Sequence, residues 1–109
     1  MQMNQAERLA ENESLFRKVN ERINELQAGE WDVEAIDFMC ECADETCLKV
    51  IRLQPAEYER IRNNPTHFVV LPGHEVEDVE DVVERHADYV VVEKHAETAQ
   101  RVIDADPRL

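Results

Sequence analysis

Hydrophobic side chains in the first quarter of the chain recur at intervals of three and four residues. Residues 4–28 carry this pattern with one polar gap at Asn12, and Gly29 follows. Such spacing is typical of an amphipathic helix, and glycine commonly ends a helix. We therefore predict a long helix over residues 4–28. Its apolar stripe consists of Leu9, Phe16, Val19, Ile23 and Leu26.

This apolar stripe can be buried in two ways. A lone helix of this length is marginal in water, so its apolar face must be buried somewhere. One interpretation is that the stripe packs on the protein's own sheet. The other is that it forms a short coiled-coil seam with a second copy or a protein partner, because the apolar residues follow a heptad spacing. We treat the five residues as a candidate partner-binding site.

The rest of the chain alternates between short β-forming runs and short helical patterns. Alternating apolar and polar positions predict strands over residues 35–40 and 48–53, joined as a hairpin. Pro55 suits the first position of a helix, which we predict over residues 55–63. The elements predicted after it are a strand over residues 68–71, a helix over 77–86 with Val79, Val82 and Val83 on one face, a strand over 89–92 and a helix over 96–103.

This order of elements predicts an α+β fold. The first two strands are joined too closely to be parallel, whereas strands separated by helices usually form parallel βαβ crossovers. We therefore expect a long N-terminal helix, a small mixed β-sheet with a knuckle-like hairpin, and short packing helices. Within one domain of 109 residues, the helix would occupy residues 1–30 and the rest of the fold residues 31–109.

Three cysteines cluster at the predicted hairpin tip. Cys40, Cys42 and Cys47 form the motif C-x-C-x4-C. Because Cys40 and Cys42 are two residues apart, their side chains face the same way at a strand end, and the loop that follows allows Cys47 to fold back beside them. Three thiolates provide most of a tetrahedral zinc site, which needs one more ligand.

His74 is our candidate for the fourth ligand. It follows Pro72 and Gly73, which predict a tight turn at the end of the strand over residues 68–71 and would direct the imidazole toward the hairpin. A set of three cysteines and one histidine leaves no position for water, so we expect one structural zinc ion per chain. Weaker candidates for this position are His67, His86, His95, Glu75, Asp44 and Asp37.

Two other roles for the cysteines stay open. Buried thiols can pack as small hydrophobic side chains. Alternatively, Cys47 could cycle through a disulfide with Cys42 or Cys40. Redox-active thiols usually lie beside positive charge or at a helix N-terminus, whereas Glu41 and Asp44 flank these three. Negative charge raises a thiol pKa, which favours metal binding over a reactive thiol.

Composition narrows the class of protein further. The chain carries 25 acidic and 12 basic residues, a net charge of −13, so we expect no direct contact with nucleic acid. The acidic residues are concentrated in residues 31–48 and 73–90. Three interpretations of these segments stay open: a solvated surface, a docking surface for a basic partner, or a DNA mimic. No apolar run reaches the roughly 20 residues of a membrane span, and the polar start lacks a secretory signal, so we expect no membrane contact and a cytoplasmic location.

Four segments resemble a family of small uncharacterised bacterial proteins. The resemblance supports treating Cys40, Cys42, Cys47 and His74 as one set of ligands, and it implies no activity. The matching motifs are F-x-C-E-C-x4-C at Phe38–Cys47, A-E-Y-E-R-I-R at Ala56–Arg62, F-V-V-x-P-G-H-E at Phe68–Glu75 and Y-V-V-V-E-K at Tyr89–Lys94.

These patterns favour a small zinc-binding, non-enzymatic adaptor or regulatory protein that contacts a protein partner or a second copy. No glycine-rich phosphate loop and no nucleophile elbow is present in the sequence, so we expect no enzyme activity. A thiol-based redox or metal sensor is one alternative. An acidic DNA mimic that binds a basic nucleic-acid-binding protein is another.

Overall fold

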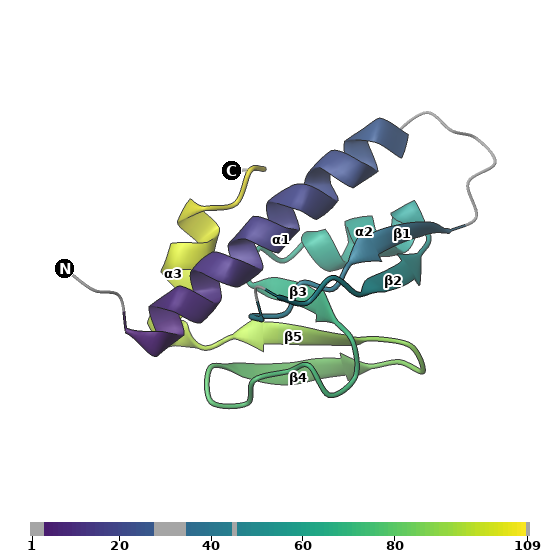
Figure 1. The fold of residues 1–109 in the computed structure, drawn as a ribbon. Coiled ribbons are helices and arrows are strands. Elements are labelled where there is room, and N and C mark those ends of the chain that lie inside the picture. The colour runs from purple at the N-terminus through teal and green to yellow at the C-terminus, as the bar shows by residue number, and fades with distance from the viewer. Residues whose placement is uncertain (1–3, 28–34, 45, 109) are drawn as a thin grey trace.

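The computed structural model describes residues 4–27, 35–44 and 46–108. Within these ranges the chain forms an α+β fold with a long N-terminal helix, as predicted (Figure 1). The helix end predicted at Gly29 and the boundary predicted at residue 30 lie outside the described residues. The elements in chain order are α1 (Gln5–Gln27), β1 (Ile36–Met39), β2 (Val50–Leu53), α2 (Pro55–Arg62), β3 (His67–Val70), β4 (Glu80–Arg85), β5 (Val90–Lys94) and α3 (Ala96–Asp104).

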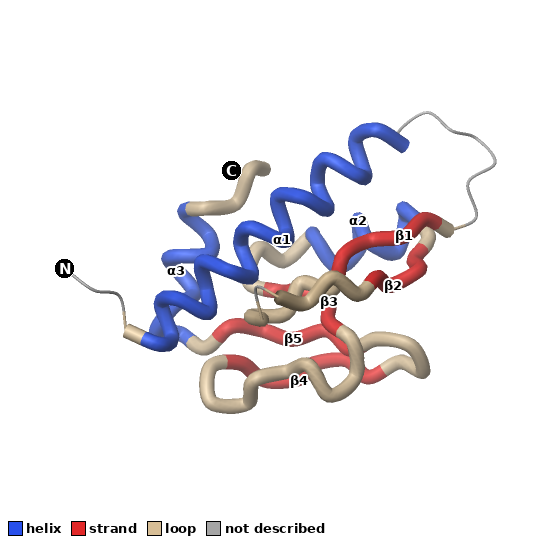
Figure 2. The backbone as a smooth tube through the Cα atoms, viewed as in Figure 1, coloured by secondary structure: helices blue, strands red, loops and turns tan. Residues whose placement is uncertain are grey.

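The strands form two antiparallel sheets rather than the mixed sheet that we predicted (Figure 2). β1 and β2 pair as the predicted hairpin, with Phe38 opposite Ile51. The second sheet has the order β3-β5-β4, and both of its pairings are antiparallel. The predicted parallel crossovers are therefore wrong for the described part of the chain.

The helix predicted over residues 77–86 is also wrong, because this segment contains β4. Its valines fit a helical spacing, but β-branched side chains favour a strand. β5 lies between β3 and β4, so β4 completes the hydrogen bonding of a strand that is buried along most of its length. A bulge between Val82 and Glu84 shifts the register, and this irregularity removes the simple alternation by which the strand could have been recognised.

The hydrophobic core joins the two sheets to α2. Phe38 of β1 stacks on Tyr58 of α2 with ring centroids 4.4 Å apart, and both side chains are fully buried. Phe68 of β3 is buried beside them in the same cluster. α2 contacts β3, and α3 contacts both α1 and β5, so the helices pack against the sheets and α3 fills the end near the start of α1 (Figure 1).

The face of α1 that contacts the rest of the molecule is largely polar. Ala10 and Phe16 are its buried apolar residues. Glu13 pairs with Lys94 of β5, and Glu21 accepts from Arg62 of α2 at 2.8 Å. The polar and charged residues of α1 that are buried are Glu13, Ser14, Arg17, Asn20 and Glu21. Buried hydrogen bonds between polar and ionisable side chains therefore fix α1 in place, which the apolar periodicity did not predict.

The predicted apolar stripe of α1 is divided between the interior and the surface. Phe16 is buried, and Leu9 and Ile23 are half-buried. Ile23 packs against the protein's own core. Val19 and Leu26 remain 40% and 64% exposed. The protein itself therefore covers part of the stripe, and only the other part is available to a partner.

Candidate metal centre

The three cysteines lie on the connection between β1 and β2. The ladder of the hairpin continues one residue past β1, because the N–H of Cys40 donates to the carbonyl of Lys49 at 2.9 Å. Beyond this point the loop is held by Asp44, whose carboxylate accepts from the N–H and the hydroxyl of Thr46. The N–H of Cys47 donates to the carbonyl of Asp44 at 3.0 Å. This tight turn returns Cys47 to the side of the loop where Cys40 lies.

A second turn brings His74 to the cysteines. The N–H of His74 donates to the carbonyl of Leu71 at 2.9 Å, which closes a four-residue turn. Pro72 occupies its second position, and Gly73 occupies the third with a φ of 89°. A positive φ at this position favours glycine, as in type II turns. The predicted turn is confirmed, and it places the imidazole against the hairpin.

The four side chains bring their ligand atoms close enough together to surround one metal ion. His74 Nδ1 lies 3.7 Å from the sulfur of Cys40 and 3.7 Å from the sulfur of Cys47. With Cys42 included, all four ligand atoms lie within 4.8 Å of one another. Zinc bond lengths of about 2.3 Å to sulfur and about 2.0 Å to nitrogen give a sulfur–nitrogen separation of about 3.6 Å in a tetrahedron. The cluster could therefore hold a metal ion such as zinc, with Nδ1 as the imidazole ligand.

Backbone N–H groups surround the sulfur atoms. The N–H of Leu71 donates to the sulfur of Cys40 at 3.2 Å. Backbone hydrogen bonds from Cys42 to Cys40, from Asp44 to Cys42 and from Lys49 to Cys47 each lower the pKa of the thiol that accepts them. Each sulfur thus accepts at least one N–H, which stabilises the thiolate form that binds metal.

The thiols also change the pKa values of one another. A hydrogen bond from Cys42 is the main cause that lowers the pKa of Cys40. The same bond, followed by burial, raises the pKa of Cys42, and burial raises the pKa of Cys47. Without a cation, the thiolate form is therefore favoured at Cys40 and disfavoured at Cys42 and Cys47. A divalent cation would remove this difference, because it stabilises all three thiolates at once.

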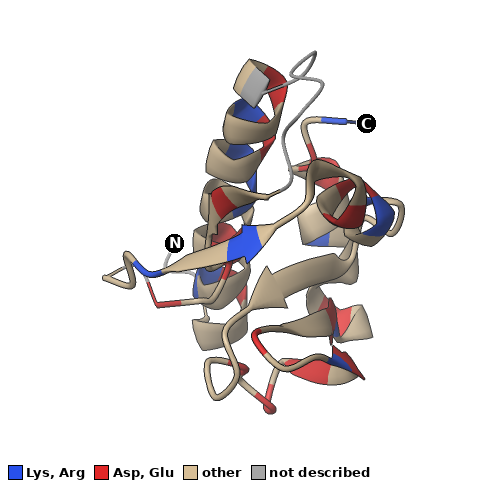
Figure 3. Ribbon diagram, turned by 90° about the vertical axis from the view of Figure 1, so that its right-hand side faces the viewer, with Lys and Arg blue, Asp and Glu red and all other residues tan. Residues whose placement is uncertain are grey.

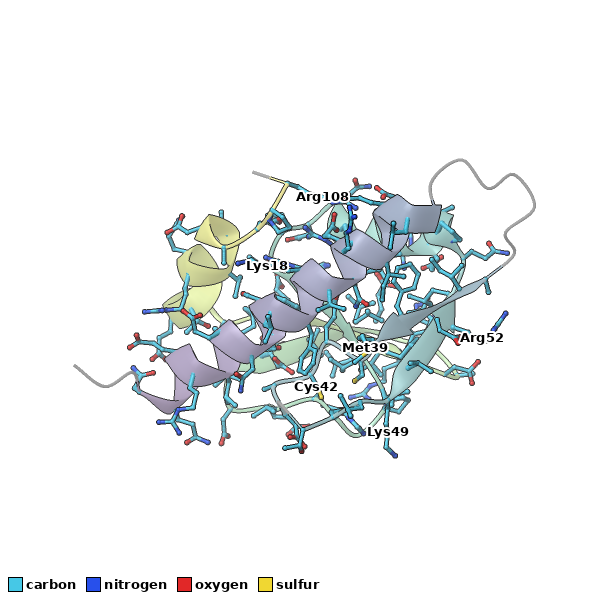
Figure 4. The ribbon with its side chains drawn as sticks, turned by 45° about the horizontal axis from the view of Figure 1, so that its top comes forward. Lys18, Met39, Cys42, Lys49, Arg52 and Arg108 are labelled. Carbon is cyan, nitrogen blue, oxygen red and sulfur yellow. The ribbon has the colours of Figure 1, made fainter. Side chains whose placement is uncertain are left out.

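The cluster is closed to solvent on most sides. The exposed fractions of Cys40, Cys42 and Cys47 are 0%, 2% and 7%, and His74 is half-buried. Figure 4 shows Cys42 beneath α1, on the same side of the helix as Met39 and Lys49. The sulfur atoms are therefore shielded from solvent by the surrounding chain.

Glu41, between two of the cysteines, fixes the hairpin to β3. Its N–H donates to the carbonyl of Val69 at 2.8 Å, and its carboxylate accepts from the N–H of Val69 at 3.0 Å. Asn20 and Tyr58 donate to the same carboxylate at 2.8 and 3.0 Å. The residue is fully buried, so our interpretation of Glu41 as part of an acidic segment at the surface is wrong. Only the cysteines on either side hinted at its position.

The other candidate ligands lie elsewhere. His67 faces Glu93 at 3.7 Å, and His95 faces Asp81 at 3.1 Å. Asp44 and Glu75 are engaged in the two turns that present the cysteines and His74. Asp37 lies 3.4 Å from Arg52 on the hairpin. Among the described residues, His74 is therefore the candidate that lies beside the three cysteines.

A second group of metal-ligand types lies on the surface, where α2 meets the hairpin of β4 and β5. Glu57, Glu84 and His86 have ligand atoms within 4.8 Å of one another. The guanidinium of Arg60 donates to both carboxylates, and His86 stacks on Tyr89 at 4.4 Å. Because Arg60 already bonds to both carboxylates, this group is a surface ion-pair cluster that joins α2 to the sheet.

Comparisons with known proteins add no further information. No family model, no curated protein and no solved structure matches the chain. The resemblance based on the cysteine and P-G-H-E motifs therefore stays a prediction. No helix in the described ranges is long and apolar enough to span a membrane.

Proposed function

We propose that the protein is a small zinc-binding, non-enzymatic adaptor or regulatory protein, and that one zinc ion per chain stabilises its fold. The observation that carries the proposal is the cluster of Cys40, Cys42, Cys47 and His74, whose ligand atoms all lie within 4.8 Å of one another. Four protein ligands complete a tetrahedron, so a bound ion would have no open position for water or substrate.

The position of the cluster explains why the fold would need the ion. The cysteines belong to the sheet of β1 and β2, whereas His74 follows β3 in the other sheet. Zinc would therefore join the two sheets. Structural zinc binding contributes on the order of 10 kcal/mol, most of it as folding free energy, which is comparable to the whole stability of a domain of this size.

The exposed part of α1 is the proposed contact for a protein partner or a second copy. Val19 and Leu26 of the predicted stripe are 40% and 64% exposed, and Leu15 beside them is 56% exposed. These three residues are spaced four and seven apart, so they share one helical face. Leu26→Asp should abolish binding of such a partner and leave the melting temperature unchanged, because the side chain is already in water. A fall in melting temperature would instead mean that Leu26 supports the fold.

A thiol-based sensor that uses the same cluster is the second candidate. The hydrogen bond from Cys42 lowers the pKa of Cys40, so Cys40 is the thiol most easily converted to a thiolate. Oxidation would join it to a neighbouring cysteine and expel the metal. Treatment with hydrogen peroxide followed by thioredoxin distinguishes the two candidates. A sensor releases and regains zinc reversibly, whereas in a structural site the ion protects the thiols from oxidation.

A matched pair of histidine variants tests the structural zinc. His74→Ala removes the proposed ligand, and His67→Ala removes a half-buried histidine that faces Glu93 and lies outside the cluster. We expect His74→Ala to lose most of the zinc and to melt at a much lower temperature, while His67→Ala keeps both properties of the wild type. Equal zinc content in the two variants would overturn the proposed ligand set.

A further inference from the structure

The two sheets have four outer strand edges, and three of them are closed. The edge of β1 is covered by the side chain of Asn20 on α1. Its amide oxygen accepts from the N–H of Met39 at 2.7 Å, and its amide nitrogen donates to the carbonyl of Met39 at 2.8 Å. A single side chain thus bonds to the backbone at this edge as a neighbouring strand would.

The edges of β3 and β4 are closed in different ways. Glu41 bonds to both backbone groups of Val69 and occupies the outer edge of β3. β4 carries a bulge between Val82 and Glu84, and the exposed charges of Asp81 and Arg85 lie on either side of it. Bulges and charged residues are devices that prevent a further strand from pairing.

Within the described residues, no side chain covers the outer edge of β2 and no bulge interrupts it, and its two exposed charges, Lys49 and Arg52, are both positive. The bond from Cys40 to Lys49, together with the register of β1 and β2, directs the backbone groups of Lys49, Ile51 and Leu53 toward β1. In an antiparallel pair the alternate residues point the other way, so the N–H and C=O groups of Val50 and Arg52 face outward. Across the described ranges, no group forms a hydrogen bond with them.

Apolar and basic side chains flank this open edge. Leu48 and Val50 are 76% and 49% exposed. The side chains of Lys49 and Arg52 extend outward from the hairpin (Figure 4). In a chain with a net charge of −13, residues 48–53 carry two positive charges and no negative one. Figure 3 shows acidic residues, in red, on many other segments of the ribbon.

We propose that the outer edge of β2, from Leu48 to Leu53, is a docking site for an extended acidic segment of a partner protein. The segment would add a strand to the sheet of β1 and β2 by bonding to the outward groups of Val50 and Arg52. Its apolar side chains would cover Leu48 and Val50 on one face of the sheet, and its acidic side chains would pair with Lys49 on the opposite face.

Charge decides between this partner and a second copy. Pairing of β2 with β2 of another molecule would bring two positive edges together, which is unfavourable. The inference deepens the proposed adaptor function, because the hairpin that bears β2 is the one that zinc would hold. It assigns partner binding to an edge that is separate from the exposed face of α1.

The test is a titration of the zinc-loaded, 15N-labelled protein followed by NMR. The probe is a blocked heptapeptide of alternating valine and glutamate, and the control peptide has lysine in place of glutamate. We expect the largest shifts at the amides of Val50 and Arg52, and at least tenfold weaker binding of the lysine peptide. No shifts at β2, or equal binding of the two peptides, would overturn the proposal.

Two substitutions sharpen the test. Val50→Pro removes an outward N–H and no bond to β1, so it should weaken peptide binding at least tenfold. Lys49→Glu should do the same, while its control Arg85→Glu, an exposed charge reversal on β4, should bind as the wild type does. Shifts at β2 that depend on protein concentration without peptide would assign the edge to a second copy and overturn the acidic partner.

The experiments distinguish failure of the proposed zinc site from failure of the proposed docking site on β2. Zinc content and melting temperature are measured on the same samples. A zinc-loaded, folded protein without peptide shifts at β2 contradicts the docking site alone. Shifts at β2 in a folded protein that contains no zinc contradict the structural metal alone.

Discussion

Replacement of the buried carboxylate of Glu41 tests how the candidate metal centre is attached to the sheets. In Glu41→Ala the N–H of Val69, the amide of Asn20 and the hydroxyl of Tyr58 each lose an acceptor. A buried donor that loses its partner costs about 1–3 kcal/mol. Burial of the carboxylate offsets part of this loss, because it raises the pKa of Glu41 and so disfavours its charged form. We therefore expect a net loss of about 4 kcal/mol.

The control is another carboxylate of the same hairpin. Asp37 is 54% exposed at its side chain and lies 3.4 Å from Arg52, which is 69% exposed. Exposed ion pairs contribute about 0–1 kcal/mol, so Asp37→Ala should change the stability by less than about 1 kcal/mol. Tyr58→Phe, which removes one of the three donors, should cost about 1 kcal/mol.

Urea unfolding followed by circular dichroism gives the three free energies. Each protein is loaded with zinc, and the metal content is measured before unfolding so that loss of the ion is separated from loss of the hydrogen bonds. If Glu41→Ala were as stable as Asp37→Ala to within about 0.5 kcal/mol, the carboxylate would not hold the hairpin to β3, and the argument from burial would be refuted.

Three further predictions follow from single positions. Gly73→Ala should cost about 1 kcal/mol in urea unfolding and weaken zinc binding in a competition with a chelator, because the φ of 89° is unfavourable for alanine although nothing lies within 4 Å of the added carbon. Arg60→Ala should cost less than about 1 kcal/mol in thermal melts despite its several hydrogen bonds, because the cluster is on the surface. Burial and a bond to Glu80 raise the pKa of Glu13 above 4.5. The contribution of this group to the free energy of unfolding is therefore fully present below pH 4.5 and is lost as the pH rises toward its pKa in the folded state. Glu13→Gln, which cannot titrate, should therefore lose less stability than the wild type in urea unfolding between about pH 5 and pH 8, and equal losses would contradict the buried proton.

The sequence was sufficient where local chemistry determines the structure. Pro55 predicted the start of α2, and the structure has proline in its first turn. Pro72 and Gly73 predicted the turn that presents His74. The spacing of the cysteines was informative because residues two apart at a strand end share a side. The cluster itself therefore followed from the order of a few residues along the chain.

The sequence was insufficient where long-range contacts determine the structure. The valines near β4 fit a helix as well as a strand, and only the pairing with β5 distinguishes the two. Glu13, Glu21 and Glu41 resemble surface acids in the sequence, yet each is buried by a basic or polar residue more than 20 positions away. No periodicity of apolar residues can reveal such partners, because the pairing depends on the packed arrangement of α1 and the sheets.

The most direct measurement is the metal content of the protein purified without chelator, by elemental analysis together with thiol titration of the folded chain. If zinc stabilises the fold, we expect about one zinc ion per chain. We also expect the three cysteines to react with a thiol reagent only after the ion is chelated. Chelation should also lower the melting temperature steeply. A folded protein with no bound metal, whose three thiols titrate freely and whose melting temperature is unaffected by chelator, would contradict the structural zinc.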